Sequence, residues 1–182
     1  MRDSMKAILL VPLVVFGVIT VFFAFGYLVM LVLGMPFSLG LVLPIRLFGT
    51  LVLVSGFLFL GWLFKYRKPV DIIFSTYTTF LKVRRGDLLE KRLSRTEALV
   101  IEGPYRYVRH PLYFGVVVIV IGWWLILDIS FLLVSAILLL LWFNFVVARF
   151  EEEELRALFG ERYQEYAKEV PRIIPFTKRG KK

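Results

Sequence analysis

Residues 7–33 form one long, mainly apolar run that contains no charged residue. A helix needs about 20 such residues to cross the hydrocarbon core of a bilayer, because each residue adds about 1.5 Å. The run is too long for the apolar region of a signal peptide, and no small-x-small cleavage site follows it. We therefore expect a retained transmembrane helix and a fold built within a membrane.

Three more apolar runs follow, at 41–64, 112–127 and 129–148. Asp128 alone separates the last two runs, so we expect a tight turn there and a helical hairpin around it. Hydrophobic residues make up 59% of the chain, against roughly half of an average soluble domain, and this surplus implies contact with lipid. The predicted fold is an all-α integral membrane protein with about four transmembrane helices, in a single membrane domain over 1–182.

The net charge of +9 is distributed unevenly along the chain. Of the 23 Lys and Arg residues, Arg46 alone lies near the predicted non-cytoplasmic side, whereas the others lie near the N-terminus, within 65–109 or after 145. This positive-inside pattern predicts a multi-pass protein with both termini in the cytoplasm. The basic surplus should attract anionic lipid headgroups rather than nucleic acid. With no cysteine and one histidine, we expect neither a disulfide nor a metal site.

The polar parts of the chain lie between and after these runs. Residues 72–83 are apolar and aromatic but too short to span, which suggests an interfacial or re-entrant helix, and the charged residues 84–97 are expected on the surface. After 149, apolar residues recur every three or four positions up to Pro171. This spacing predicts an amphipathic cytoplasmic helix that packs on the bundle or lies in the membrane interface. The residues that form its apolar side are Leu155, Phe159, Tyr163, Tyr166 and Val170.

The stretch 102–115 reads EGPYRYVRHPLYFG and contains the one histidine of the chain. A residue that precedes proline favours an extended backbone, so His110 should lie outside a helix, while Pro111 suits the first helical position. This places the imidazole at a helix start beside Arg109, with Tyr113 one turn further on. Helix N-termini attract anions. A basic anchor to headgroups and a ligand site are equally good interpretations of the spacing alone.

Four consecutive glutamates occupy 151–154, directly after the last apolar run. A charge run usually forms a solvated face, yet carboxylates here oppose the cytoplasmic surface potential, which favours cations. Arg149 can pair with Glu153 one turn away. Glu151 and Glu152 would then be available to a ligand that carries an amino group or a sulfonium.

Other polar residues have simpler interpretations. Arg46 is expected to extend to the headgroups, and Asn144 to make an interhelical hydrogen bond. Arg172, between two prolines, is expected to be solvated, with contact to an anionic substrate group as the alternative.

Two motifs together resemble a known family. The segment GPYRYVRHPLYFG, then a two-helix hairpin, then the pattern EExxLxxxFGxxYxxY and the ending VPRIIPF are similar to the isoprenylcysteine carboxyl methyltransferases, which are related to the phospholipid N-methyltransferases. The resemblance covers about 99–176, and its motifs are specific in combination rather than singly. It implies an integral membrane enzyme that uses S-adenosylmethionine without the soluble Rossmann fold. It also implies a lipophilic acceptor that arrives from the bilayer, either a small molecule or a prenylated substrate.

The resemblance further implies roles for individual residues in a cytoplasmic cofactor-binding region at 99–176. Arg109 and Arg172 would be catalytic and would position the acceptor. The cofactor would be bound by Tyr105, His110, Pro111, Tyr113, Gly115, Glu151 and Glu152.

The acceptor stays open, because the chain has fewer spans than the larger eukaryotic enzymes of the family. An isoprenylcysteine-like carboxylate needs no general base, whereas an amine does, and neither His110 nor Glu102 is a convincing base. We therefore expect a carboxylate, with the amine of a phospholipid ethanolamine as the alternative. Two weaker alternatives are a sterol-reductase-like enzyme that uses NADPH and a membrane scaffold without activity. Acidic residues at 151–154 disfavour the phosphate-bearing NADPH.

Overall fold

The computed structural model describes residues 2–73 and 99–177, with side chains from residue 9 onward. The regular elements in these ranges are all helical, which confirms the predicted all-α class. The surface segment predicted at 84–97, and all but the first two positions of the interfacial helix predicted at 72–83, lie outside the described residues. The elements are α1 (Arg2–Val32), α2 (Leu43–Tyr66), a short helix at 69–73, η2 (Gly103–Arg106), α4 (Pro111–Leu127), α5 (Ser130–Trp142), η3 (Phe143–Val147) and α6 (Ala148–Glu169).

Three of the described helices are long and apolar enough to cross a membrane, so the chain is a multi-pass membrane protein. They are α1, α2 and the continuous helix that runs from α5 through η3 into α6. Helix α4 is apolar but has only 17 residues. It is the short arm of the predicted hairpin, and the count of four spans stays a prediction.

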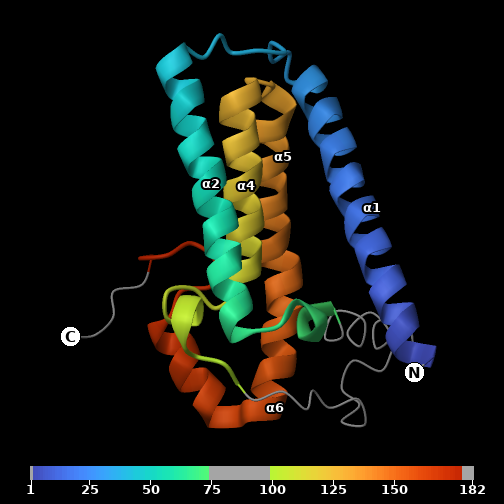
Figure 1. The fold of residues 1–182 in the computed structure, drawn as a ribbon, viewed down its shortest axis with the longest axis vertical. Helices are drawn as coiled ribbons and strands as arrows, with labels where there is room; N and C mark the ends of the chain where they lie inside the picture. Colours follow the sequence, from blue (N-terminus) through green and yellow to red (C-terminus); the bar gives the residue numbers. More distant parts are fainter. Residues whose placement is uncertain (1, 74–98, 178–182) are drawn as a thin grey trace.

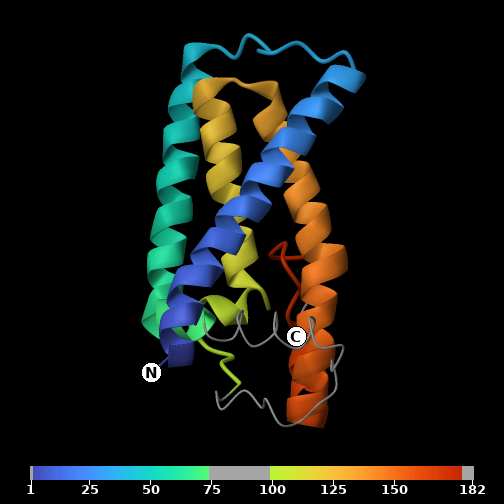
Figure 2. The same ribbon diagram turned by 90° about the vertical axis from the view of Figure 1, so that its right-hand side faces the viewer.

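Helices α2, α4 and α5 lie side by side, while α1 crosses the bundle obliquely (Figures 1 and 2). Small residues bring α2 and α4 close together: a Cβ added to Gly49 would lie 2.5 Å from the Cβ of Leu125, and one added to Gly122 would lie 2.7 Å from the Cα of Leu53. Close packing of this kind stabilises helix pairs in lipid, where the hydrophobic effect cannot drive association.

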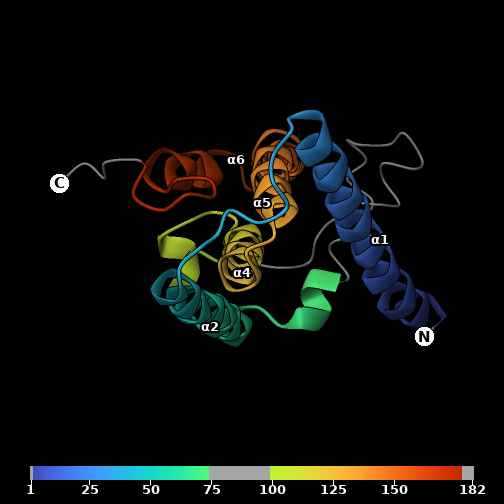
Figure 3. The ribbon, with the colours of Figure 1, turned by 90° about the horizontal axis from the view of Figure 1, so that it is seen from above.

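Helix α1 contacts α5 through the second half of α1, where Gly26 faces Ser135 and the rings of Phe23 and Phe131 meet edge to face. Toward its N-terminal end, α1 diverges from the other helices (Figure 3). The divergence leaves room for a cavity between this half of α1 and the bundle.

The turn between α4 and α5 is bound to the loop between α1 and α2. Asp128 adopts a left-handed backbone (φ 56°), which confirms the predicted turn. Its carboxylate accepts hydrogen bonds from the Ser38 hydroxyl at 2.5 Å and from the amides of Leu39 at 3.1 Å and Leu41 at 2.9 Å. The Ser38 hydrogen bond lowers the pKa of Asp128. Arg46 donates to the carbonyl of Ile126 at 2.8 Å, and its extension to the headgroups stays a prediction.

The predicted cytoplasmic helix after 149 differs in two ways from expectation. It is continuous with α5 through the π-helical turn η3, so no break separates the span from α6. It then bends sharply at Gly160, whose backbone (φ 53°, ψ −130°) is not helical. Beyond the bend the chain folds back toward the bundle (Figure 1), and this return brings residues 163–172 beside the start of α4. Its predicted place at the membrane interface stays a prediction.

Candidate functional site

Two segments that are far apart in the sequence run beside each other at the start of α4. The amide of Arg109 donates to the carbonyl of Pro171 at 2.9 Å, and the amide of His110 donates to that of Arg172 at 3.0 Å. His110 has a non-helical backbone (φ −121°, ψ 68°) and α4 begins at Pro111, as the sequence predicts. The extended residue before the proline thus leaves both amides available for this pairing.

Glu152 is the centre of a buried ionic network. Its side chain is 1% exposed. Arg109 donates to Oε1 from Nε at 3.1 Å and from Nη2 at 2.6 Å. Arg172 donates to Oε1 from Nε and to Oε2 from Nη2, both at 2.9 Å. Two guanidinium groups therefore share one buried carboxylate, which offsets the cost of removing it from water.

The same arginines also bind backbone carbonyls. Nη1 of Arg109 donates to the carbonyls of Ala167 and of Val170, the latter at 3.0 Å. Nη1 of Arg172 donates to the carbonyl of Asn144 in η3 at 3.0 Å. The two side chains consequently join the end of the last span, the returning C-terminal segment and the start of α4.

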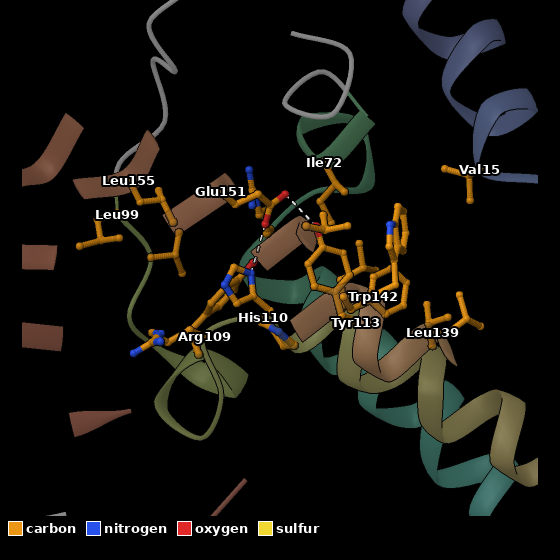
Figure 4. Close-up of a pocket in the computed structure, with 18 of the residues that line it drawn as sticks. Val15, Ile72, Leu99, Arg109, His110, Tyr113, Leu139, Trp142, Glu151 and Leu155 are labelled. Carbon is orange, nitrogen blue, oxygen red and sulfur yellow. Dashed lines mark hydrogen bonds and ion pairs between the residues drawn. The ribbon is translucent and has the colours of Figure 1, made fainter. Parts of the chain in front are cut away.

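Glu151 faces a different side of α6 from Glu152. Its carboxylate accepts a hydrogen bond from the Tyr113 hydroxyl at 2.8 Å, and its Oε2 lies 3.1 Å from Nδ1 of His110 (Figure 4). The rings of His110 and Tyr113 stack, and Tyr113 stacks in turn on Phe143, with centroids 4.5 Å apart. With an exposed fraction of 24%, Glu151 is more accessible than Glu152.

The carboxylates of Glu151 and Glu152 shift the pKa of the His110 imidazole. Burial alone would lower the pKa of His110, but its hydrogen bonds and charge interactions with Glu151 and Glu152 outweigh burial and raise the pKa. Glu152 lies in α6, the polar end of the long helix that begins with α5. Burial and neighbouring charges also have opposite effects on its pKa. Burial favours a protonated Glu152, but the contacts from His110, Arg172 and Arg109 hold its pKa well below the usual range. The site thus favours the ionised form of Glu152 and shifts His110 toward its protonated form.

A cavity of about 370 Å³ opens beside Glu151, a volume near the lower end for small-molecule sites. One end is polar and is formed by Arg109, His110 and Glu151. The rest is mainly apolar and aromatic, with walls from α1, α4, α5, η3 and α6. The cavity therefore presents a carboxylate and ring faces to one occupant, and an apolar wall to another.

Six of the nine predicted site residues line this cavity: Tyr105, Arg109, His110, Pro111, Tyr113 and Glu151. The other three do not. Gly115 packs against α2, where an added Cβ would lie 2.4 Å from Leu60. Glu152 is bound to Arg109 and lines neither pocket, and Arg172 lines a second pocket that Arg109 also lines. The predicted pair Glu151 and Glu152 is therefore adjacent to His110 but divided between two environments.

Several cavity residues were not predicted. Those of α6 had a signal, because Leu155, Phe159, Tyr163 and Tyr166 belong to the apolar spacing recognised in the sequence. Those of α1 and α5 had none beyond their apolar character, since only the tilt of the helices brings them to the cavity. They are Val14, Val15, Val18 and Ile19 from α1, and Leu139 and Trp142 from α5.

The cavity has the features that a cationic, ring-bearing cofactor requires. The carboxylate of Glu151 suits an ammonium group, and the rings of Tyr113, Trp142 and Phe143 can pack on a heterocycle or attract a sulfonium. Within 2–73 and 99–177 no cluster of side chains could hold a metal ion. The residues present therefore fit an organic cation.

Comparison with known proteins identifies a family match over most of the chain. The family model described as phospholipid methyltransferase matches residues 45–162. No solved structure matches.

Curated relatives match over shorter stretches. The methanethiol S-methyltransferase of Crocosphaera subtropica is 36% identical over 84 residues, covering 43% of this chain and 29% of that protein. The protein-S-isoprenylcysteine O-methyltransferase B of Arabidopsis thaliana is 34% identical over 109 residues (56% and 48%), and the protein-S-isoprenylcysteine O-methyltransferase of Homo sapiens is 39% identical over 93 residues (50% and 32%). The chain spans less than half the length of each of these relatives.

Proposed function

This chain belongs to the phospholipid methyltransferase family, and we propose that it is an integral membrane methyltransferase that uses S-adenosylmethionine to methylate a lipophilic acceptor. The curated relatives are named as methyltransferases that act on oxygen or sulfur, which supports the proposal. When bound, the cofactor supplies an electrophilic methyl group on a sulfonium. The protein has to bind the cofactor and the acceptor, orient them toward each other, and exclude water from the site.

Glu151 is the residue to which we assign the ammonium group of the cofactor. It lines the cavity, and its carboxylate is held by Tyr113 and His110 in one orientation. Tyr105, Tyr113 and the start of α4 at Pro111 form the adjoining wall. Glu152 supports this site from behind, because its carboxylate is already bound by two arginines.

The acceptor that this geometry favours is a carboxylate on an isoprenylcysteine-like molecule. The observation that carries this choice is the imidazole of His110, whose Nδ1 lies 3.1 Å from Glu151 and whose Nε2 lies 3.4 Å from Glu152. The two carboxylates raise the pKa of His110 and so favour its protonated form, which cannot accept a proton from an amine. A carboxylate is already deprotonated at neutral pH and needs no base.

The lipid portion of the acceptor is assigned to the apolar wall of the cavity. Val14, Val15 and Val18 line the cavity on the half of α1 that diverges from the bundle (Figure 3). A prenyl chain can therefore lie against α1 while its carboxylate head lies at the polar end of the cavity, near Arg109 and His110. The catalytic role predicted for Arg109 and Arg172 stays a prediction, and their contacts support a positioning role in addition.

Cofactor binding is the first test. Titration calorimetry on the protein in nanodiscs should show S-adenosylmethionine binding that Glu151→Gln weakens at least about tenfold, the effect of losing one charged hydrogen bond. Glu153→Gln is the matched control, because Glu153 is exposed and belongs to the same run. Absence of binding by the wild type, together with thermal stabilisation by NADPH, would favour a reductase instead. If the protein neither binds S-adenosylmethionine nor is stabilised by NADPH, a scaffold without activity would be favoured.

The acceptor requires a second experiment. The protein is incubated with S-adenosylmethionine labelled in the methyl group and with a total lipid extract that includes prenylcysteine, and the labelled product is treated with base. Base-labile label indicates a methyl ester and supports the carboxylate. Base-stable label in an ethanolamine phospholipid would replace this proposal with N-methylation.

A further inference from the structure

A second pocket, of about 820 Å³, adjoins the Arg109–Glu152–Arg172 network, and both arginines line it. Its lining contains four cationic side chains and no acidic one. The cations are Arg109, Arg156, Lys168 and Arg172, and the remaining lining residues are Gln164, Ala167, Pro171 and Thr177. Its composition therefore suits an anion.

The positive charge of this pocket is only partly neutralised. Glu152 is the carboxylate that the three arginines share, and it is buried behind them. Arg156 lies 3.6 Å from Glu152 and is 51% exposed. Lys168 is exposed and makes no ion pair with any residue in the described part of the chain. One carboxylate against four cations leaves a net positive pocket that is open to a ligand.

The pocket lies at the level where the last span ends. Arg172 reaches the carbonyl of Asn144 in η3, the turn that follows the apolar helix α5. The segment after α6 runs back toward the spans (Figures 1 and 2). Along this segment the side chains of Ile174 and Phe176 are 51% and 84% exposed. A basic pocket thus adjoins exposed apolar side chains, as the interface of a bilayer requires.

We propose that this pocket binds the phosphate of an anionic phospholipid, with the acyl chains against Ile174 and Phe176. The exposed guanidinium of Arg156 and the ammonium of Lys168 are suited to a phosphate. The apolar residues beside them favour a lipid over a free anion. This site is separate from the acceptor site, because among the described residues the two linings share Arg109 alone.

Binding has a mechanical consequence for the network. Arg156 and Arg172 approach the same carboxylate and repel each other. A phosphate between the arginines and Lys168 reduces this repulsion and holds the segment after α6 against the bundle. Anionic lipid should therefore raise the thermal stability of the protein.

The test compares nanodiscs of phosphatidylcholine with nanodiscs that contain a graded fraction of phosphatidylglycerol, which has no amine to methylate. The bound phosphatidylglycerol is counted by native mass spectrometry, and Tm is followed in parallel. We expect selective retention by the wild type and a loss of affinity of about tenfold or more in the double variant Arg156→Gln/Lys168→Gln. The control is Arg162→Gln, which changes an exposed arginine of α6 outside the pocket and should have an effect below about twofold.

Three results would overturn the proposal. The first is equal retention of both lipids by the wild type. The second is an equal loss in the Arg162→Gln control, which would show a diffuse charge effect. The third is displacement of the lipid by millimolar inorganic phosphate, which would assign the pocket to a soluble anion. Circular dichroism of the double variant, expected to equal that of the wild type, shows that it is folded. Lys168→Gln alone should keep the wild-type affinity for S-adenosylmethionine and lose part of the lipid retention.

Discussion

Adjacent glutamates at 151 and 152 differ in what surrounds their carboxylates. Glu151 contacts Tyr113 and His110 and borders the cavity, whereas Glu152 is enclosed by two arginines. The sequence predicted that both lie near His110, and they do. It did not predict which glutamate would border the cavity and which would bind the arginines. Successive residues on a helix point about 100° apart, and the rotation of α6 about its axis follows from the π-helical turn before it. No residue type in 143–147 indicates a π-helical turn.

The first prediction concerns stability at this pair. Glu152→Gln leaves the buried Arg109 and the partly buried Arg172 without their shared anion and should lower the free energy of unfolding by about 3 kcal/mol. Glu151→Gln and Glu153→Gln should each change it by less than about 1 kcal/mol, since these side chains are more exposed. Denaturant unfolding in detergent micelles measures all three. Equal values for Glu152→Gln and Glu153→Gln would show that the network contributes no stability.

The second prediction concerns pH and His110. Because the folded-state pKa is raised above the ordinary value of 6.5, the contribution of His110 to stability is fully present below about pH 6.5 and is lost as the pH rises through the raised value. Tm should therefore fall as the pH rises above about 6.5, and His110→Gln should flatten that decline. A decline of the same size in the variant would assign the effect to other groups.

At the scale of elements, the start of α4 and the end of α6 could be predicted, whereas the bend between them could not. Pro111 and Pro171 mark a helix start and a helix stop, and both are found where expected. Gly160 lies inside an apolar periodicity that continues on either side, so nothing in the spacing indicates a break. The bend is nevertheless what returns Tyr163 and Arg172 to Arg109.

The third prediction follows from this bend. Gly160 has a backbone conformation that residues with a Cβ rarely adopt, although an added Cβ would meet no atom within 4 Å. Gly160→Ala should therefore cost about 1–3 kcal/mol of stability and weaken cofactor binding. Gly61→Ala is the matched control, because Gly61 also has open space but lies within α2. It should be neutral or slightly stabilising. Equal effects would show that the bend does not depend on glycine.

At the scale of the molecule, the apolar runs predicted the helices but not the tilt that forms the cavity. Residues 7–33 were expected to span, and α1 does form one long helix there. Its oblique path depends on contacts such as Gly26 with Ser135, which are made between elements far apart in the chain. The hydrogen bonds between Asp128 and the loop at 38–41 were not predicted either, because the sequence indicates only that Asp128 is a turn residue.

The fourth prediction concerns orientation. The chain has no cysteine, so single cysteines can report the side on which a residue lies. Leu39→Cys, in the loop between α1 and α2, and Thr177→Cys, after α6, should react with an impermeant maleimide from opposite sides of the membrane. We expect Thr177→Cys to react from the cytoplasmic side, as the distribution of basic residues implies. Labelling of both from the same side would contradict the topology.

The network around Glu152 also imposes an order on biogenesis. Its members come from positions 109, 152 and 172, and a ribosome delivers the N-terminal one first. All the apolar helices can enter the bilayer before Arg172 has been synthesised, but Glu152 gains its second guanidinium only afterwards. The network around Glu152 is thus completed only after the last apolar helix has been synthesised.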